Sequence, residues 1–415
     1  MRTMIFDKSI INIGELLLME NNGPIKGSSM QELSIIHNAA IGIIDNKVAW
    51  IGKMKDMKNK KSNYVIDAKG KLVTPGLIDS HTHLVFDGSR EKELILKQKG
   101  ASYLEILNNG GGILSTVNAT REASKNQLIN KSLFHLDRFL SYGVTTVEAK
   151  SGYGLAIEAE IKQLKVVQEL NKQHPIDIVS TFLGAHTIPP KYTKDSTGYL
   201  SLLGESLELI KHNNLADYVD ITVEDGMFSI DESRYYLEKA KDLCFGLKMH
   251  CEQFSSIGAI DLAVDLKATS VDHLEVTTTN NVKLLANSNM VGVLLPGVSF
   301  YLDMQYANAR NIIDYNGAIA LSTDFNPGSC VTENLQLIMS IAALKMNLSP
   351  SEIWHAVTVN AAHAIGKGNE AGAIMLDRPA DIVIWEAQNH MYIPYHFGVN
   401  HTNTVIKNGE IVYER

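Results

Sequence analysis

The sequence predicts an α/β protein in which a TIM-like (β/α)8 barrel carries a small β-sandwich domain built from both chain termini. Between about residues 74 and 377, eight apolar, strand-like runs alternate with helical stretches. Eight β-then-α units are what a closed parallel barrel requires. Short β-rich segments near both chain ends supply the second domain. We therefore expect residues 1–73 and 378–415 to form the small domain, and residues 74–377 to form the barrel.

The two chain ends share β-rich patterns. Residues 39–52 (AAIGIIDNKVAWIG) are apolar around a turn at Asp45-Asn46, and residues 380–387 (ADIVIWEA) form a second apolar run. In residues 403–415 (NTVIKNGEIVYER), Asn408-Gly409 is a strong signal for a two-residue hairpin. These segments predict one small sheet domain assembled from both ends.

The barrel strands are read from apolar runs and from the helical stretches between them, such as residues 155–173 and 233–244. The eight predicted strands are LVTPGLIDSHTHL (72–84), GVTTVEAK (143–150), IDIVSTFLGAH (176–186), YVDITVE (218–224), GLKMHCE (246–252), ATSVDHLE (268–275), VGVLLP (291–296) and GAIALSTDF (317–325). Between the first two strands, Gly110-Gly111-Gly112 predicts a mobile lid segment.

Composition narrows the class of protein. The formal net charge is -8, which argues against a nucleic-acid partner or binding to a membrane surface. Three cysteines are too few for a disulfide framework, and no stretch approaches the roughly 20 apolar residues of a membrane span. We therefore expect a soluble, cytoplasmic enzyme that acts on a small molecule.

Ionisable residues stand at the ends of most predicted strands. In chain order they are His81, His83, Glu148, Lys150, His186, Glu224, His250, His273 and Asp324, with Tyr153 just after the second strand. The carboxyl ends of barrel strands converge on one mouth, where the active sites of such barrels lie. The sequence therefore predicts one polar site at that mouth.

His81 and His83 form an HxH pair after an apolar run. Residues two apart on a strand share a face, so both imidazoles can reach one ion. His250 and Asp324 stand at later strand ends, and three imidazoles with one carboxylate suit zinc or iron(II) with a position left for water. We expect one divalent metal bound by these four residues.

Hydrolysis at such a metal requires a group that moves protons. His273, one strand beyond His250, is the candidate for proton transfer or for polarising a carbonyl. The alternative is a neutral histidine satisfied by Asp272 or Glu275. Asp324 could contact the metal, take the proton from water, or do both.

Arg90 follows the first strand. Its guanidinium could hold a substrate carboxylate in a bidentate pair. The alternative is a surface arginine paired with Glu91 or Asp87.

Six motifs together resemble the imidazolonepropionase family of the amidohydrolase superfamily: PGLIDSHTHLVFDGSR, YGVTTVEAKSGYGL, TFLGAHTIP, KMHCEQFS, SVDHLE and STDFNPGS. The first is shared by many amidohydrolases, whereas SGYGL, GAHTIP and DFNPGS are much more specific. The resemblance covers essentially the whole chain. It implies hydrolysis of the cyclic amide of 4-imidazolone-5-propanoate to N-formimino-L-glutamate in histidine catabolism.

The resemblance also assigns residues. It implies a single metal, zinc or iron, on His81, His83, His250 and Asp324. It implies substrate contacts from Arg90, Tyr153, His186, Gln253, Asn326, Gly328 and Ser329. Some members of the family carry Glu where this chain has Gln253, and an amide cannot act as a general base. Proton transfer here then falls to His273, Asp324 or a bridging water.

Three further expectations complete the interpretation. Lys150 invites comparison with the carbamylated lysine that bridges two metals in related hydrolases, but the single metal favours a structural or supporting role. The rival functions are an aromatic deaminase acting on a guanine-like ring, and a non-catalytic scaffold that has lost its metal. A homodimer is the default assembly for enzymes of this kind.

Overall fold

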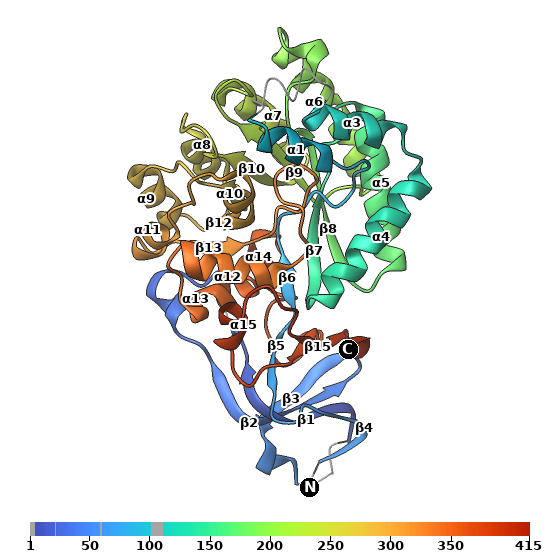
Figure 1. Cartoon of the computed structure of the whole chain (residues 1–415), viewed down its shortest axis with the longest axis vertical. Coiled ribbons are helices and arrows are strands. Elements are labelled where there is room, and N and C mark those ends of the chain that lie inside the picture. Colours follow the sequence, from blue (N-terminus) through green and yellow to red (C-terminus); the bar gives the residue numbers. More distant parts are fainter. Residues whose placement is uncertain (1–4, 21, 59, 101–110) are drawn as a thin grey trace.

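The computed structural model describes residues 5–20, 22–58, 60–100 and 111–415. Its strands fall into two eight-stranded sheets, one in the upper body and one at the lower end of the molecule in Figure 1. Gly110 of the predicted lid segment lies outside the described residues.

The first of these sheets is the predicted parallel barrel. Its strands pair in chain order and are β6 (Leu77–Asp79), β7 (Val144–Lys150), β8 (Asp177–Ala185), β9 (Tyr218–Val223), β10 (Gly246–Cys251), β11 (Ser270–His273), β12 (Val291–Leu294) and β13 (Ala318–Leu321). Each of the eight strands falls within one of the eight predicted runs. Most observed strands are shorter than the runs, because the runs include loop residues at their ends. The first run is divided: its residues Leu72–Pro75 form β5 of the second sheet, and only Leu77–Asp79 belong to the barrel.

The two outer strands of the barrel meet just beyond their carboxyl ends. The backbone nitrogen of His83 donates to the carbonyl of Phe325 at 2.9 Å, and that of Asp324 donates to the carbonyl of His81 at 3.0 Å. Thr82 and Phe325 form a parallel bridge at the same place. Closure therefore occurs at the level where the predicted metal ligands lie.

Helices cover the outside of the barrel, as Figure 1 shows. They are α1 (Glu91–Gln98), α3 (Ile113–Glu122), α4 (Lys125–Ser141), α5 (Ile157–Gln173), α6 (Ser196–His212), α7 (Ile230–Asp242), α8 (Ala259–Leu266), α9 (Thr279–Asn287), α10 (Pro296–Leu302), α11 (Ala309–Asp314), α12 (Leu335–Lys345), α13 (Pro350–Ala356), α14 (Val359–Ala364) and α15 (Tyr392–Tyr395), with short 3-10 turns at Gly27–Gln31, Met54–Met57 and Pro190–Tyr192. Local sequence sets several helix starts. Ser124 and Ser229, for example, each begin a capping box with the residue three positions later.

The second sheet joins the two chain ends, as predicted. Its strands are β1 (Ile5–Leu17), β2 (Ile35–Ile44), β3 (Lys47–Lys53), β4 (Lys61–Asp67), β5 (Leu72–Pro75), β14 (Ile382–Trp385), β15 (Thr402–Lys407) and β16 (Glu410–Glu414). They pair in the order β16-β15-β14-β5-β1-β2-β3, with β4 on β1. Only Gly76 separates β5 of this sheet from β6 of the barrel. The residue limits of the two predicted domains stay a prediction.

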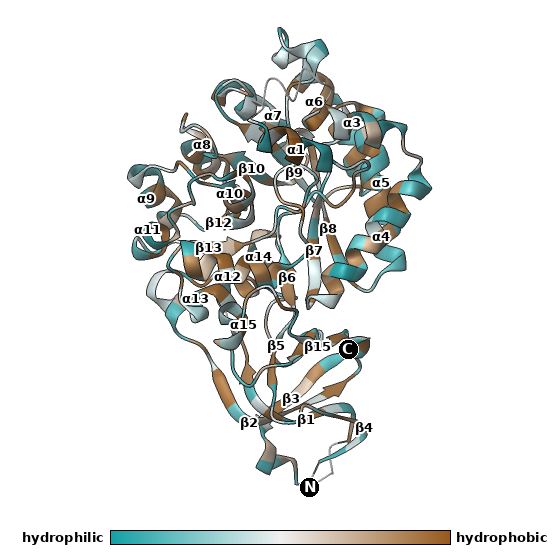
Figure 2. Cartoon of the chain, in the orientation of Figure 1, coloured by the Kyte–Doolittle hydropathy of each residue, from teal (hydrophilic) through white to brown (hydrophobic). Residues whose placement is uncertain are grey.

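Apolar residues fill the space between strands and helices. Figure 2 shows them on the barrel strands and on parts of the surrounding helices. The largest fully buried side chains include Trp354 and Trp385, and the indole nitrogen of Trp385 donates to Thr74 Oγ1 at 2.9 Å. No helix in the described part of the chain is long and apolar enough to cross a membrane.

Candidate metal centre and substrate pocket

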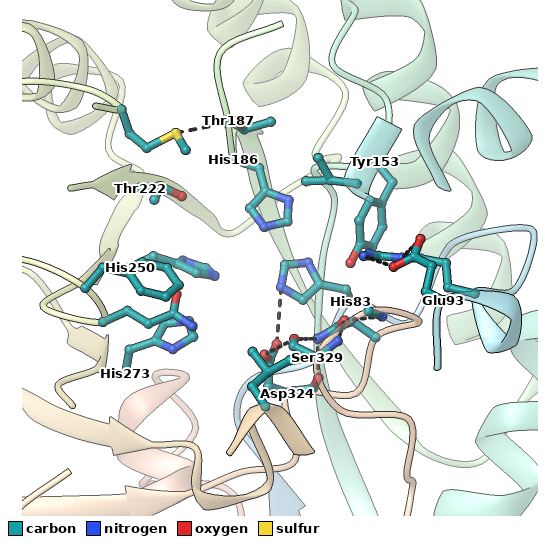
Figure 3. A pocket seen from close by; sticks show the side chains of 18 residues that line it. His83, Glu93, Tyr153, His186, Thr187, Thr222, His250, His273, Asp324 and Ser329 are labelled. Carbon is teal, nitrogen blue, oxygen red and sulfur yellow. Dashed lines mark hydrogen bonds and ion pairs between the residues drawn. The ribbon is translucent and has the colours of Figure 1, made fainter. Parts of the chain in front are cut away.

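The predicted metal ligands converge at the mouth of the barrel. His81 and His83 follow β6, His250 lies on β10 and Asp324 follows β13. The ligand atoms of His81, His83 and His250 lie within 4.8 Å of one another, and so do those of His81, His273 and Asp324. Figure 3 shows His83, His250, His273 and Asp324 around one space. These four side chains and that of His81 are all buried.

The cluster fits a bound cation. Nε2 of His81 and of His250, together with Oδ1 of Asp324, are buried yet make no hydrogen bond among the residues that the structure describes. Asp324 Oδ1 lies 3.3 Å from His81 Nε2 and 3.4 Å from His83 Nε2. Buried polar atoms nearly always have a partner, so convergent atoms that lack one indicate a ligand. Imidazole nitrogens and a carboxylate oxygen are donors suited to a divalent metal.

Two carboxylates orient the ligand rings from behind. Asp272 Oδ2 lies 2.7 Å from His81 Nδ1 in a hydrogen bond. Asp220 Oδ2 lies 3.1 Å from His250 Nδ1, which is an ion-pair distance without hydrogen-bond geometry. A carboxylate beside Nδ1 favours the proton there and leaves Nε2 free as a metal donor. Neither aspartate was predicted to act in this way.

The pKa values of two ligand rings are lowered by burial. Burial lowers the pKa of His250 to about 4, against the opposing charge of Asp220, and it also lowers the pKa of His83. At neutral pH both rings are therefore uncharged, which is the form that binds metal.

The other two predicted ligands carry opposite charges in the metal-free centre. For His81, burial and the Lys150 charge favour the neutral ring, but Asp272 and Asp324 outweigh them and raise its pKa to about 9. Burial opposes ionisation of Asp324, yet contacts with His81 and His83 hold the pKa of this carboxyl well below its usual range. A divalent cation on Nε2 of His81 would replace the proton that the two carboxylates now favour.

His273 makes no hydrogen bond with an acidic residue among those that the structure describes. Its Nδ1 is 3.7 Å from Glu275 Oε2, too far for a hydrogen bond, and both atoms are unpaired among the described residues. The alternative of a histidine satisfied by Asp272 or Glu275 therefore does not describe this ring. The backbone of His273 is left-handed (φ 88°), as is that of Asp324 (φ 51°). Non-glycine residues held in this region cluster at functional sites.

A cavity of about 590 Å³ opens beside the cluster. Its lining includes all seven predicted substrate contacts, together with His83, His250, His273 and Asp324. The seven are Arg90, Tyr153, His186, Gln253, Asn326, Gly328 and Ser329. The volume suits a small ligand that meets the polar cluster at one end.

Arg90 pairs with neither of the residues considered from sequence. Its Nε and Nη2 donate to the two carboxylate oxygens of Glu93 at 2.9 and 2.8 Å. Glu93 also accepts the backbone N–H of Gly112 at 2.7 Å. One side of the guanidinium is therefore fixed, and Nη1, which lies against Gly328, remains on the pocket side. Sequence reasoning missed Glu93, for which the only signal was its position three residues beyond Arg90 at the start of α1.

The turn after β13 holds Asp324 in place. Asn326 Oδ1 accepts the backbone N–H groups of Gly328 and Ser329, both at 2.8 Å. Asn326 Nδ2 donates to the carbonyl of Asp324 at 2.7 Å, and Ser329 Oγ donates to Asp324 Oδ2 at 3.3 Å. The pattern of Asx and serine side chains thus shapes both the pocket wall and the carboxylate.

Tyr153 and His186 form another wall, where the His186 ring stacks on that of His83 with centroids 4.8 Å apart. Burial raises the pKa of Tyr153, so its hydroxyl stays protonated. Glu160 on α5 shapes the loop that carries this tyrosine by accepting the backbone N–H groups of Gly152, Gly154 and Leu155 at 2.7–2.9 Å. Sequence reasoning also missed Glu160.

Three strand-end residues lie away from the pocket. Glu224 accepts the backbone N–H groups of Gln253 and Ser255 and so braces the loop after β10. Glu148 and Lys150 are fully buried inside the barrel. A position at a strand end was therefore not a sufficient sign of a pocket residue.

Comparisons with known proteins agree with this arrangement. A family model described as "Amidohydrolase family" matches residues 219–412. Curated proteins named imidazolonepropionase from Bacillus cereus (strain AH187) and Bacillus anthracis are each 51% identical over 413 residues, covering 99% of this chain and 98% of the relative.

Solved structures share the fold at low sequence identity. A zinc-bound adenosine deaminase from Xanthomonas campestris matches with a TM-score of 0.74 and 15% identity, over 99% of this chain and 93% of the other. Guanine deaminase from E. coli matches with a TM-score of 0.73 and 16% identity, over 98% of this chain and 100% of the other. The fold therefore does not separate these activities, whereas the 51% identity over nearly the full length does. The chain belongs to the imidazolonepropionase family of the amidohydrolases.

Proposed function

We propose that this protein hydrolyses the cyclic amide of 4-imidazolone-5-propanoate to N-formimino-L-glutamate, a step in histidine catabolism. One observation supports this proposal most strongly: a single pocket is lined both by the His and Asp donors His83, His250 and Asp324 and by the guanidinium of Arg90. The first group suits metal-assisted hydrolysis, and the second suits a substrate that carries a carboxylate.

The residues that would hold the ion are His81, His83, His250 and Asp324. The donor set suits zinc and iron(II) alike, and we propose a single ion of either kind. When bound, a divalent ion supplies Lewis acidity that activates water and polarises a carbonyl.

Substrate recognition is assigned to the residues that line the cavity. Arg90 would take the propionate through Nη1 and the outer N–H of Nη2, because Glu93 occupies the opposite side of its guanidinium. Gly328 and Ser329 border the same space. Tyr153, His186 and Gln253 would contact the ring from the remaining walls.

Proton transfer is assigned to Asp324 and His273. Asp324 is ionised, because contacts with the neighbouring histidines keep its pKa low. We assign to this carboxylate the acceptance of the proton from the attacking water. His273 faces the same cavity, where it can polarise the ring carbonyl or deliver a proton to the leaving nitrogen. In the balanced reaction, water adds to the carbonyl carbon, the carbon–nitrogen bond breaks and the nitrogen gains a proton. The amide of Gln253 orients the ring and does not act as a base.

Turnover with identification of the product tests this function. Metal-loaded protein would be mixed with freshly prepared 4-imidazolone-5-propanoate, with guanine and adenosine as rival substrates, and the products identified by mass spectrometry. We expect N-formimino-L-glutamate from the first compound and no reaction with the purines. Deamination of guanine without turnover of the imidazolone would refute the assignment in favour of the deaminase alternative.

We also propose that the protein is a cytoplasmic homodimer without a nucleic-acid or membrane partner. The net charge of -8 supports the absence of a polyanionic partner. Size-exclusion chromatography with light scattering would measure the molar mass of the protein in solution. A molar mass equal to that of a single chain would refute the dimer.

A further inference from the structure

Lys150 stands among three carboxylates in the interior of the barrel. Its Nζ lies 2.8 Å from Asp220, 3.0 Å from Glu148 and 3.2 Å from Asp272. The side chains of all four residues are fully shielded from solvent. Burial alone would lower the pKa of this lysine, but the three carboxylates raise it above its ordinary value, so the group is an ammonium. Three neighbouring anions would repel a carbamate on this nitrogen.

Two of these carboxylates contact the lysine and a metal-ligand ring through the same oxygen atom. Asp272 Oδ2 is 3.2 Å from Lys150 Nζ and 2.7 Å from His81 Nδ1. Asp220 Oδ2 is 2.8 Å from Lys150 Nζ and 3.1 Å from His250 Nδ1. One ammonium thus joins the two contacts that orient two of the four proposed metal ligands.

The charges of this cluster require the ammonium. Ion pairs link four carboxylates (Glu148, Asp220, Asp272 and Asp324) but only two ammonium groups, those of Lys150 and Lys248. With His81 neutral, as a metal ligand would be, these six side chains leave a formal charge of -2, which matches the charge of one divalent ion. Without Lys150, Asp220, Asp272 and Glu148 would repel one another in a medium where such repulsion is strong. The three carboxylates would then move apart, and Asp272 and Asp220 would lose their contacts with Nδ1 of His81 and of His250.

We propose that Lys150 is a positioning residue of the metal centre, which fixes Asp272 on His81 and Asp220 on His250. The lysine is neither one of the proposed metal ligands nor part of the lining of the substrate pocket. The inference rests on the proposed metal site but not on the proposed substrate. Its test therefore measures metal binding, and a failure of the substrate assignment would leave it untouched.

The test replaces Lys150 with methionine, which has a similar length and no charge. The control is Lys407→Met, because Lys407 is also a buried lysine between two carboxylates, with Nζ 2.6 Å from Asp381 and 2.5 Å from Asp177. That lysine lies on β15, outside the barrel. The dissociation constant of Zn²⁺ would be measured by competition with a chromophoric chelator, and the visible spectrum of the Co²⁺ form would report the geometry of the ligands.

We expect Lys150→Met to weaken zinc binding 10- to 100-fold, as loss of a group that supports metal ligands does, and to alter the cobalt spectrum. The control should lose thermal stability while its zinc affinity and spectrum stay unchanged. Zinc affinity in Lys150→Met that is equal to or tighter than that of the original protein would overturn the proposal. Such a result would show that the Lys150 ammonium only repels the metal ion and does not position its ligands.

A second variant keeps the proposal testable if Lys150→Met does not fold. Lys150→Met/Asp272→Asn removes one positive and one negative charge and leaves the balance of the cluster unchanged. Because the lysine also fixes Asp220 on His250, the double variant should still bind zinc more weakly than Asp272→Asn alone. Zinc affinity in the double variant that is equal to or tighter than that of Asp272→Asn would contradict the proposal.

Discussion

Gly328 lies against the guanidinium of Arg90, and its replacement by alanine displaces that group without touching any metal ligand. A Cβ at this position would stand 2.1 Å from Nη1 and 2.8 Å from Cζ. Ordinary contact begins at 3.4 Å, so Nη1 would have to retreat by the difference, about 1.3 Å. The backbone of Gly328 is not left-handed, so alanine itself causes no backbone strain.

The retreat should cost substrate binding rather than stability. Arg90 is anchored by two hydrogen bonds to Glu93, so a shift of this size misaligns Nη1 from a carboxylate in the pocket. One hydrogen bond to a charged group contributes about 1.5–3 kcal/mol. At about 1.4 kcal/mol for each factor of ten, its loss would raise KM roughly 10- to 100-fold. Because the carboxylate is held equally before and during reaction, kcat should change little.

Steady-state kinetics with 4-imidazolone-5-propanoate would measure both constants. The inhibition constants of 3-(imidazol-4-yl)propanoate and of its neutral amide would distinguish binding of the carboxylate from binding of the ring. Gly204→Ala is the control, because that glycine lies on α6 with only the flexible side chain of Lys239 nearby. The reasoning fails if Gly328→Ala leaves KM unchanged, or if it weakens both inhibitors equally.

Four further predictions follow from the same contacts. Glu93→Gln should release the guanidinium of Arg90 and raise KM several-fold with kcat preserved, and an unchanged KM would show that Glu93 does not orient this residue. Glu160→Gln should weaken three backbone hydrogen bonds in the loop of Tyr153 and lower kcat/KM about tenfold with a stability loss of about 1–3 kcal/mol, measured by kinetics and urea unfolding. For Glu232, burial opposes ionisation but hydrogen bonds from Ser196, Ser229 and Thr197 lower the pKa from 4.5 to about 2. Its contribution to stability should be complete above pH 4.5 and be lost as the pH falls through 2, so urea unfolding should separate Glu232→Gln from the original protein at pH 7 and much less at pH 2. Removal of divalent metal by a chelator should lower the Tm, and re-addition should restore it; a Tm indifferent to metal would count against a centre formed in the folded state.

The barrel and the proposed metal ligands could be predicted because each depends on local sequence. Apolar runs mark the eight strands, and ionisable residues mark the strand ends that a parallel barrel brings together. The alternation along an extended segment places His81 and His83 on one side, and the structure shows that arrangement.

The supporting contacts could not be predicted, because each depends on tertiary neighbours. Glu93 lies beside Glu91, and only the packing of α1 decides which of the two reaches Arg90. Asp220 and Asp272 look like ordinary strand residues until the barrel closes around His250 and His81. For the same reason, the position of Lys150 at a strand end did not show that its side chain is enclosed inside the barrel. Other strand-end residues line the pocket at the mouth.

The central claim is that one divalent ion at the barrel mouth is required for hydrolysis of the imidazolone ring. Titrating metal-free protein with zinc or iron(II), while following loss of the ring's ultraviolet absorbance, tests this claim most directly. A His250→Ala variant run in parallel reports whether the proposed ligands carry the effect. We predict that turnover rises in proportion to added metal, levels off at one equivalent per chain, and is absent from the variant. Full turnover without metal, or equal turnover by the variant, would contradict the account.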